Sequence, residues 1–579
     1  MFKTNINFKN YYLKKIKKLD WIKKPKIIIK KGKNNHLSWF PDGQINLYEN
    51  CISKHLKKDK NKIAIITVSQ KKKIKQFTFE EIDKKVNNMA YFLNKSLKKN
   101  KLKVMIHASA SIESAVLMLA CAKLGIHFSV IFEELEKLGI KNRIKLFKPN
   151  IFFSRYSKKN FLNKMSFKSY KKIHFIYEDR IKKIMNKKNS IKIKNKNVNS
   201  YDSLFTLFTS GSTGVPKGIT HSTGGYLLYS KITCENQFGI NDTSVVLTAS
   251  DAGWINGHTY SLFGPLSIGS TTILIEKPIS LIDIKLLNKI LSLKTSVVYL
   301  PVTLIRLIRS LNKNFKINKK YIKTLGSMGE PLAPSVARWF AEKFLKKNKA
   351  IVNTYFQTET GGIICSPRYN QNINQVPHGS VGEPFSKFIK INNLDTKKIS
   401  EITINTPWPG IMKKIINGKE EWNKYWDENG NFRLFDLASQ KKKNIFIHGR
   451  SDDVINIRGH RIGSEEIEST ILKIKKIIEC CVITLSDNLE GSKIYLFVVS
   501  DKNLDEKIEK IIISTFGTFA TPSKIFYVKQ IPKTRSGKIL RRLLREIVAN
   551  PNLNNYGDIS TILNLNSLKD VQKIVKLND

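Results

Sequence analysis

Short runs of β-favouring residues alternate with longer amphipathic stretches along most of this chain, and that alternation restricts its fold more than any other feature. Residues 63–68 and 104–108 are apolar and rich in β-branched side chains, whereas 79–97 and 112–124 carry apolar residues at helical spacing. Strands that alternate with helices in this way are joined by crossover connections and lie parallel in a sheet. We therefore predict an α/β fold with a parallel sheet.

The chain is too long for one ordinary hydrophobic core, so its 579 residues predict two or more domains. A second α/β portion is expected over 204–446, and a third unit from about Arg450 onward. Residues 154–200 are crowded with lysine and asparagine and are expected to form a strand or two and a surface linker. The later portions are expected to contain strands at 244–248, 271–275, 296–300, 401–404, 481–485 and 494–499, a helix at 464–478 and a basic helix from Ile539.

The chain is strongly basic, with 101 Lys and Arg residues against 46 acidic residues and a formal net charge of +55. Such a balance raises the question of binding to nucleic acid or to anionic membranes. The lysines are scattered through almost every segment, often beside asparagine and isoleucine, as an AT-rich coding bias would produce. A nucleic-acid surface would instead concentrate them in one block with interleaved aromatic residues. We therefore favour composition bias and expect no nucleic-acid partner.

Targeting and redox signals favour a cytoplasmic protein. The six cysteines have neither metal-ligand spacing nor the density of a secreted disulfide scaffold, which fits a reducing compartment. Residues 1–18 lack the continuous apolar core of a secretory signal. The most apolar long stretch, 114–132, is interrupted by Lys123 and His127, so it does not offer an uncharged span of about 18 residues. We expect no membrane insertion.

The strongest single motif is LFTSGSTGVPKG at 207–218. Its glycines allow backbone N–H groups to turn toward an anion, its hydroxyls donate to phosphate oxygens, and its lysine supplies positive charge. A flexible surface loop is the alternative, but this residue order is more specific than a loose glycine-rich run. The Walker A pattern G-x-x-x-x-G-K-[ST] does not occur, which excludes a P-loop NTPase. The residues expected to surround the phosphates are Thr209, Ser210, Gly211, Ser212, Thr213, Gly214 and Lys217.

Five motifs in this order resemble those of the adenylate-forming superfamily, which comprises acyl-CoA synthetases, luciferases and peptide-synthetase adenylation domains. They are TSGSTGVPKG at 209–218, GSMGEP at 326–331, TYFQTETGG at 354–362, GRSDDVINIRGHRIG at 449–463 and PKTRSGKILRR at 532–542. Within that superfamily the chain is most similar to acetyl-CoA and propionyl-CoA synthetases. Three further segments carry this closer likeness: SWFPDGQINLYENCISKHL at 38–56, SDAGWINGHTYSLFGPL at 250–266 and GDISTI at 557–562.

The resemblance covers nearly the whole chain and implies the fold of an adenylate-forming enzyme, which belongs to the α/β class. Residues 1–451 would form a large N-terminal domain of layered α/β subdomains, with an acetyl-CoA-synthetase-like segment at 20–80. Residues 452–579 would form a small, mobile α+β domain that turns about a hinge at Asp452. The implied reaction joins a small carboxylic acid to CoA, with ATP and CoA as co-substrates and Mg²⁺ as cofactor.

The resemblance also implies roles for particular side chains. A substrate carboxylate attacks the α-phosphate in the first step, so positioned cations and N–H donors supply most of the catalysis. Lys538 would neutralise the α-phosphate, Lys217 would assist it, Glu359 would bind Mg²⁺, and Asp436 would accept the ribose hydroxyls. Phe435 departs from the family pattern, which usually has glycine at that position. The remaining nucleotide contacts implied are Gly329, Glu330, Pro331, Asn353, Thr354, Tyr355, Phe356, Gln357, Thr358, Arg450 and Arg461.

Four residues match the acyl pocket of the family: Trp254, Ile255, Asn256 and Phe356. Acetyl-CoA and propionyl-CoA synthetases usually carry tryptophans where this chain has Tyr355 and Phe356, so the smaller Phe356 predicts a pocket that admits more than acetate. One methylene contributes only about 1–3 kcal/mol of discrimination, so acetate, propionate or a related acid fits. Asn256 replaces a more usual Thr or Val. An unpaired buried amide is costly, so Asn256 is expected either to meet a polar group of the acid or of CoA, or simply to repack.

Contacts to CoA are assigned to Asn256, Arg458 and Gly459, while Ile513 occupies a position where an arginine is expected. Two histidines near the site are expected to make structural hydrogen bonds, because a carboxylate that is already ionised needs no protein base; these are His258 and His460. Cys365 is expected to be a packed thiol.

Two other functions compete with that of an acyl-CoA synthetase. A nucleic-acid-binding protein could keep the fold without its activity, as the charge and the departures around Asp436 and Ile513 suggest, but Lys217, Glu359 and Lys538 are all retained. Alternatively, the acyl group could pass to a carrier-protein thiol, although no carrier-like L-G-G-[DH]-S segment occurs in the chain. A lysine acetyltransferase and deacetylase acting on Lys538 are expected regulatory partners, because acetylation removes the charge that adenylation requires.

Overall fold

We describe a computed structural model of the chain. The description covers residues 6–96, 102–135, 137–164, 172–188, 191–209, 216–311, 315–345, 349–392, 394, 399–416, 418–451, 454–457, 460–487, 491–534, 537–552, 556, 559 and 562–578. Within these residues, no helix combines the length and the apolar character that crossing a bilayer requires. The predicted hinge residue Asp452 lies outside the described residues, so the domain boundary at 451/452 stays a prediction.

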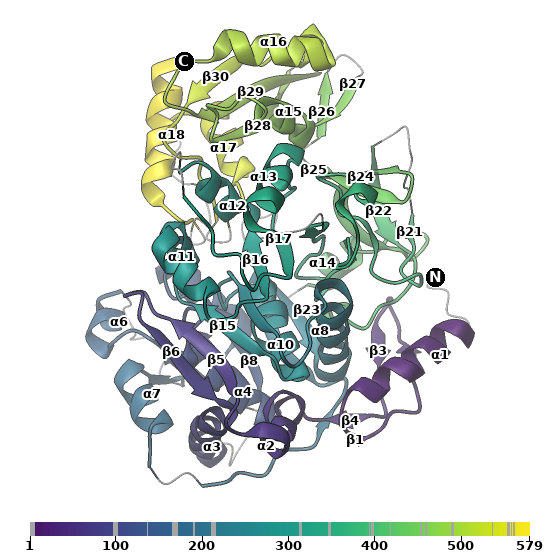
Figure 1. The fold of residues 1–579 in the computed structure, drawn as a ribbon, viewed down its shortest axis with the longest axis vertical. Helices are drawn as coiled ribbons and strands as arrows, with labels where there is room; N and C mark the ends of the chain where they lie inside the picture. The colour runs from purple at the N-terminus through teal and green to yellow at the C-terminus, as the bar shows by residue number, and fades with distance from the viewer. Residues whose placement is uncertain are drawn as a thin grey trace.

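Two seven-stranded, mostly parallel sheets form most of the N-terminal portion (Figure 1). The first has the order β10-β9-β7-β8-β12-β13-β23 and is parallel as far as β12. The second has the order β18-β17-β16-β14-β15-β5-β6, and its β5–β6 pair is antiparallel. The strands of the first sheet are β7 (Lys103–His107), β8 (His127–Ile131), β9 (Ile151–Ser154), β10 (His174–Ile176), β12 (Ser203–Thr209), β13 (Lys217–Ser222) and β23 (Lys414–Ile416). Those of the second are β5 (Ile63–Val68), β6 (Ile74–Thr78), β14 (Val245–Thr248), β15 (Thr271–Ile275), β16 (Val297–Pro301), β17 (Thr324–Met328) and β18 (Val352–Asn353).

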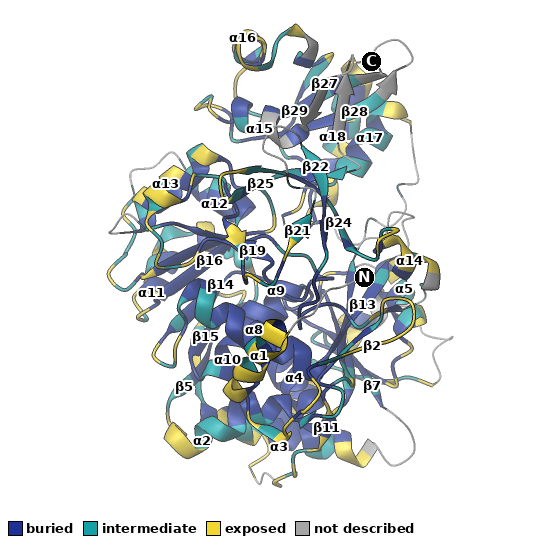
Figure 2. Ribbon diagram, turned by 90° about the vertical axis from the view of Figure 1, so that its right-hand side faces the viewer, coloured by how far each residue is buried: buried dark blue, intermediate teal, exposed yellow. Residues whose placement is uncertain are grey.

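Helices with almost no exposed face connect the two sheets. α8 (Thr223–Phe238) contacts β13 of the first sheet and β17 of the second, and α4 (Ile112–Leu124) packs on β7 and β8. Both helices are buried along nearly their whole length (Figure 2). A helix that is apolar all round belongs inside a large core, so 112–124 is a core helix and the amphipathic pattern predicted for it is wrong. α4 also begins with a capping box, in which Ser111 accepts from the backbone N–H of Ser114.

A four-stranded sheet and a separate C-terminal unit complete the molecule. The four-stranded sheet has the order β21-β22-β24-β25, with β21 at Ile391–Asn392, β22 at Ser400–Ile404, β24 at Phe432–Lys441 and β25 at Asn444–Arg450. The C-terminal unit lies at one end of the long axis in Figure 1. It contains β28 (Glu479–Asp487), β29 (Gly491–Val499), β30 (Lys524–Tyr527), α15 (Ser464–Ile471), α16 (Asp505–Phe516), α17 (Arg541–Ala549) and α18 (Leu565–Asn578). Apolar side chains of α15 and β28 join one continuous core with those of α12 (Val302–Arg309) and α13 (Pro334–Phe344).

The predicted elements agree with the structure to within a few residues, with three exceptions. Strand β5 belongs to the second sheet, although its sequence neighbours β7 and β8 lie in the first. The helix predicted at 464–478 ends at Ile471, after which the chain makes turns. The segment 154–200 also contains two helices, α6 (Lys158–Lys164) and α7 (Glu178–Met185), where only strands and a linker were predicted. Lysine and asparagine are weak guides here, because tertiary packing decides their conformation.

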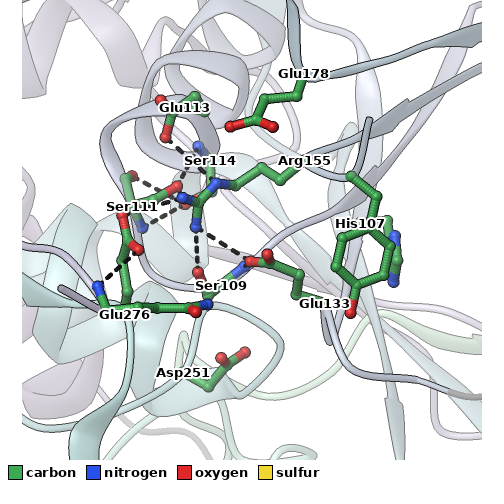
Figure 3. Close-up of polar contacts among 12 residues, drawn as sticks. His107, Ser109, Ser111, Glu113, Ser114, Glu133, Arg155, Glu178, Asp251 and Glu276 are labelled. Atoms are coloured by element: carbon green, nitrogen blue, oxygen red, sulfur yellow. Dashed lines mark hydrogen bonds and ion pairs between the residues drawn. The ribbon is translucent and has the colours of Figure 1, made fainter. Parts of the chain in front are cut away.

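A buried ionic cluster joins the two sheets where the carboxyl ends of their parallel strands meet (Figure 3). The Arg155 guanidinium lies 3.1 Å from Glu133 beyond β8, 3.1 Å from Glu276 beyond β15, and 3.5 Å from Glu113 of α4. Removing one partner from a buried ion pair costs about 3–5 kcal/mol. Arg155 therefore fixes the position of one sheet edge relative to the other, next to the region where ligands of open α/β sheets bind.

Candidate active site

The phosphate-loop motif lies on a hairpin of the first sheet. β12 and β13 are antiparallel, and Thr209 is paired with Lys217 at the end of the ladder. Ser210, Gly211, Ser212, Thr213 and Gly214 lie outside the described residues. The Lys217 ammonium lies 2.7 Å from the Glu421 carboxylate and 5.6 Å from the centre of the Tyr425 ring. Lys217 is thus held at the mouth of the loop by α14 (Lys419–Lys424) and the residue that follows it.

Tyr425 brings the second predicted catalytic residue to the same place. Its hydroxyl donates to the Glu359 carboxylate over 2.7 Å, while its ring faces Lys217. Glu359 is only 9% exposed. Burial and the adjacent Glu359 carboxylate raise the pKa of Tyr425, so its hydroxyl stays protonated and donates to Glu359. Residues 419–426 match none of the motifs, which is why Tyr425 and Glu421 were missed.

The acidic residue that the family uses to hold Mg²⁺ fits that role here. The described residues contain no group of three His, Cys, Asp or Glu side chains that could hold a metal ion without other ligands. Mg²⁺ is usually bound through one or two carboxylates together with the phosphate oxygens of a substrate. One buried carboxylate that is linked through Tyr425 to Lys217, Glu359, meets that requirement once a nucleotide supplies the remaining oxygens.

Asp436 is presented by a β-bulge. Glu401 pairs with Leu437 and Thr403 pairs with Arg433, so three residues of β24 face a single residue of β22 (Ser400–Ile404). Within the bulge, Phe435 has a φ of +54°, the left-handed conformation that favours glycine. This backbone requirement explains why the family usually has glycine at this position. The Phe435 ring packs 5.3 Å from that of Tyr425 and 4.6 Å from the Arg433 guanidinium.

We expect Phe435→Gly to be more stable than Phe435→Ala by about 1 kcal/mol, because both variants lose the ring and only alanine keeps the left-handed strain. At an ordinary β position alanine would be the more stable of the two. Urea unfolding of the two variants measures the difference. A more stable alanine variant would show that the bulge does not impose this conformation.

The Asp436 carboxylate is almost fully buried and has well-defined partners. The Tyr355 hydroxyl and the Gln357 amide each donate to Oδ2 over 2.6 Å, and the Arg450 guanidinium lies 3.7 Å from Oδ1. Burial raises the pKa of Asp436, whereas Arg450, the two donors and the Lys538 charge act in the opposite direction. With Oδ2 occupied by two donors, Oδ1 is the oxygen left to accept from the hydroxyls of a ligand.

The strip 329–331 follows β17 directly and borders open space. Gly329 has a φ of +91°, and a methyl group added to it would meet no atom within 4 Å. Glu330 accepts from the Arg306 guanidinium over 3.0 Å. Arg306 also lies 3.9 Å from Glu479 of the C-terminal unit, which forms an ion pair with Lys533 as well. The strip is therefore tied through α12 to the C-terminal unit.

The adjacent segment 353–358 is held rigidly by hydrogen bonds. Asn353 accepts from the Ser327 hydroxyl over 2.9 Å, and Thr354 shares a 2.6 Å hydrogen bond with the Tyr299 hydroxyl. The Thr358 carbonyl accepts from the His221 ring over 2.7 Å. These contacts fix the segment between the two sheets.

The C-terminal lysine lies in a turn that is attached to the N-terminal portion. Lys538 lies in a turn that is closed by a bridge between Lys533 and Ile539. The preceding residue, Gly537, has a φ of +90°, and its carbonyl accepts from the Thr303 hydroxyl of α12 over 3.2 Å. The charge of Lys538 lowers the pKa of Asp436, so the two side chains act on each other across the gap between the units. Asp452, Arg458 and Gly459 lie outside the described residues, as does the side chain of Arg461 in β27 (His460–Gly463).

Two of the predicted acyl-pocket residues, Ile255 and Asn256, lie in α9 (Ile255–His258), and Trp254 directly precedes it. The Trp254 ring lies 4.8 Å from that of Phe132, and the Phe356 ring lies 5.7 Å from that of Tyr260 in an edge-on arrangement. The Asn256 amide contacts the Met328 sulfur, a neighbour that the sequence did not identify. Ile255, Asn256 and Met328 are all buried, so this side of the site is mostly apolar.

Two residues near the pocket, His258 and Cys365, have structural roles. His258 donates to the Ala252 carbonyl over 2.9 Å, and burial lowers its pKa to about 3, so its ring is neutral. Cys365 is fully buried and packs in the main core. Burial raises the pKa of its thiol. Neither residue is poised for acid–base or nucleophilic chemistry.

Asp251, which precedes the pocket, gives the protein a predictable pH dependence. Burial raises its pKa to about 7 from an ordinary value of 3.8; the Gly253 N–H opposes this rise, Glu133 adds to it and Arg155 opposes it (Figure 3). The folded state therefore holds this proton to a higher pH than the unfolded chain does. The free energy of unfolding should fall as the pH rises from the ordinary pKa of 3.8 to the raised pKa of about 7, and then level off.

We expect Asp251→Asn to remove this dependence. The free energy of unfolding of the variant, relative to that of the unmodified protein, should therefore be higher at pH 8 than at pH 5. Urea unfolding at both pH values measures the gain. Asp242→Asn is the control, because the Asp242 side chain is 44% exposed and its pKa is lowered by Lys58. An equal difference between Asp251→Asn and the unmodified protein at both pH values would contradict the shift.

The fold and the motifs define an adenylate-forming acid–CoA ligase: two layered sheets carry the hairpin of the phosphate-loop motif, and a C-terminal unit with the lysine motif packs on α12. Three family models match the chain along its length. The AMP-binding enzyme model matches residues 52–413, the AMP-binding enzyme C-terminal domain matches 466–538, and the acetyl-coenzyme A synthetase N-terminus matches 5–51. The chain therefore belongs to the AMP-binding enzyme family.

Named relatives and solved structures agree with this assignment. An acetyl-coenzyme A synthetase of Helicobacter pylori is 31% identical over 97% of this chain and 92% of its own length. One from Leptospira biflexa is 32% identical over 95% and 92%. An acetoacetyl-CoA synthetase from Streptomyces lividans has a TM-score of 0.81 at 16% identity and covers 99% of this chain and 92% of its own. An anthranilate CoA ligase has a TM-score of 0.76 at 18% identity, over 87% and 97%. The predicted fold class and family resemblance are confirmed.

Proposed function

We propose that this protein activates a small carboxylic acid with ATP and transfers the acyl group to CoA. A carboxylate oxygen attacks the α-phosphorus, the bond to the β-phosphate oxygen breaks, and pyrophosphate leaves. The CoA sulfur then attacks the acyl carbon, AMP leaves, and the thiol proton passes to solvent. The similarity to acetyl-CoA synthetases supports acetate, propionate or a related small acid as the substrate.

The observation that carries this proposal is the attachment of the Lys538 turn to α12. The Gly537 carbonyl accepts from Thr303 of this helix, and Arg306 of the same helix donates to Glu330 of the strip 329–331. The Lys538 charge also lowers the pKa of Asp436. In this arrangement Lys538 would neutralise the α-phosphate and the attacking carboxylate, and Lys217 would neutralise the phosphates at the loop. Asp436 would orient the ribose, and Glu359 would hold Mg²⁺, which polarises the phosphate oxygens when it is bound.

The test is the release of AMP and pyrophosphate from ATP and Mg²⁺ with and without CoA, using acetate, propionate, butyrate, acrylate and 3-hydroxypropionate in parallel. CoA-dependent AMP release with any of these acids supports the proposal, and the relative rates show which acids the pocket prefers. If no acid supports release while the protein binds DNA or RNA with a strong salt dependence, the proposal fails in favour of a nucleic-acid function.

Two further properties belong to the same proposal. A cytoplasmic location suits an enzyme with six buried free cysteines, all of which the structure describes. Lys538 is exposed and carries the charge that adenylation needs, so a lysine acetyltransferase would inactivate the first half-reaction and a deacetylase would restore it.

A further inference from the structure

The amide oxygen of Asn256 is the most informative unpaired group near the site. The side chain is 6% exposed, and its Oδ1 is buried without a hydrogen-bond partner among the described residues. Folded proteins pair the great majority of their buried polar atoms, because an unpaired one loses the hydrogen bonds that it made to water. The pairing group is therefore expected to come from a ligand.

The orientation of the amide follows from its contact with Met328. Its Nδ2 faces the Met328 sulfur, which is a weak acceptor. The reverse orientation would place the amide oxygen against that sulfur and bring two acceptors together. The nitrogen is thus the end that faces Met328, and the oxygen is the end available for a donor.

Asn256 adjoins, through Met328, the strip beside which substrate would lie. Met328 is the last residue of β17, and the next residue, Gly329, borders open space. Buried apolar side chains, including Ile255, line the same side of the site. A donor that reaches Asn256 from this space would therefore belong to the acyl part of the substrate, between an apolar wall and the nucleotide strip.

The surroundings favour a neutral donor. An ammonium group in this position would lose its hydration against an apolar wall and gain one amide oxygen, which does not neutralise its charge. A hydroxyl group costs far less to bury and needs one acceptor. We propose that the substrate is a small hydroxy acid whose hydroxyl donates to Asn256 Oδ1. This inference rests on the proposed function and specifies its substrate class.

The test compares pairs of acids in which a hydroxyl replaces a methyl group of similar size: glycolate with propionate, lactate with isobutyrate, and 3-hydroxypropionate with butyrate. The kcat/KM for ATP-dependent acyl-CoA formation is measured for each acid. In at least one pair the kcat/KM of the hydroxy acid should exceed that of the apolar acid by about 10-fold to 100-fold, because an acid without the hydroxyl leaves the amide oxygen unpaired.

Asn256→Leu keeps the approximate size of the side chain and removes the acceptor. It should reverse the preference within that pair and raise activity on the apolar acid, and this gain also shows that the variant is folded. Asn566→Leu, an exposed position in α18, is the matched control and should leave the ratio unchanged.

Three results would overturn the inference. The unmodified protein could prefer the apolar acid in every pair, or Asn256→Leu could leave the ratios as they were. The third result comes from ATP–pyrophosphate exchange without CoA. If exchange does not distinguish the hydroxy acid from the apolar acid, and the preference appears only when CoA is present, Asn256 contacts CoA. Activity on apolar acids in any of these cases leaves the proposed function intact. If neither acid of any pair gives AMP, both the proposed function and the hydroxy-acid inference fail.

Discussion

Lys538→Ala should lower the rate of acyl-adenylate formation by at least about 100-fold to 1,000-fold, the usual loss when one preorganised electrostatic contact to a transition state is removed. The expected cause is the loss of the cation that would neutralise the α-phosphate from the turn fixed at Thr303. ATP–pyrophosphate exchange with the preferred acid measures this half-reaction.

The same variant should convert a supplied acyl-adenylate and CoA to acyl-CoA at close to the normal rate, because thioester formation needs no neutralisation of a leaving pyrophosphate. Lys529→Ala is the matched control, since Lys529 is an exposed lysine of the same C-terminal unit. Equal losses in both half-reactions would indicate a folding defect, and full overall activity would remove Lys538 from the catalytic role.

Asp436→Asn should raise the KM for ATP by about 10-fold to 100-fold, since hydrogen bonds to a charged group contribute about 1.5–3 kcal/mol each. The substitution removes the charge that Arg450 and Lys538 face, and it places an amide N–H where the carboxylate now accepts from Tyr355 and Gln357. Initial rates at saturating acid and CoA measure the effect.

Asp242→Asn serves as the control, because it removes a half-exposed surface carboxylate that forms an ion pair with Lys58. Its KM for ATP should not change. An unchanged KM in Asp436→Asn would mean that this carboxylate supports the bulge and does not bind the ribose. Melting temperatures of the two variants show whether a change in KM comes from loss of folded protein.

The motifs predicted which residues belong to the site, but they could not predict how those residues are held together. Lys217 and Glu359 are distant in the sequence and both contact Tyr425, which lies in a lysine- and tryptophan-rich segment without any motif. Arg306 was missed for the same reason, whereas Met328 lies inside the motif at 326–331 but its contact with Asn256 depends on packing. A motif records the atoms that meet a ligand, whereas supporting contacts depend on packing that is specific to each chain.

Local periodicity predicted most strands and the main helices because it reflects which faces are buried. It could not assign strands to sheets: β5 has the same apolar pattern as β7, yet the two lie in different sheets. Phe435 shows a related limit. Its identity suggested an altered site, while the backbone kept the left-handed conformation and only the side chain differs.

The ion pairs of Arg306 have a consequence for how the enzyme would respond to ionic strength. Arg306 lies between Glu330 of the N-terminal portion and Glu479 of the C-terminal unit, and Lys533 also contacts Glu479. If the C-terminal unit turns away between half-reactions, as in the wider family, these groups separate and become hydrated. Dissolved ions screen exposed charges far more than buried ones. Added salt would then favour the turned state, so moderate salt should shift the enzyme from adenylation toward thioester formation.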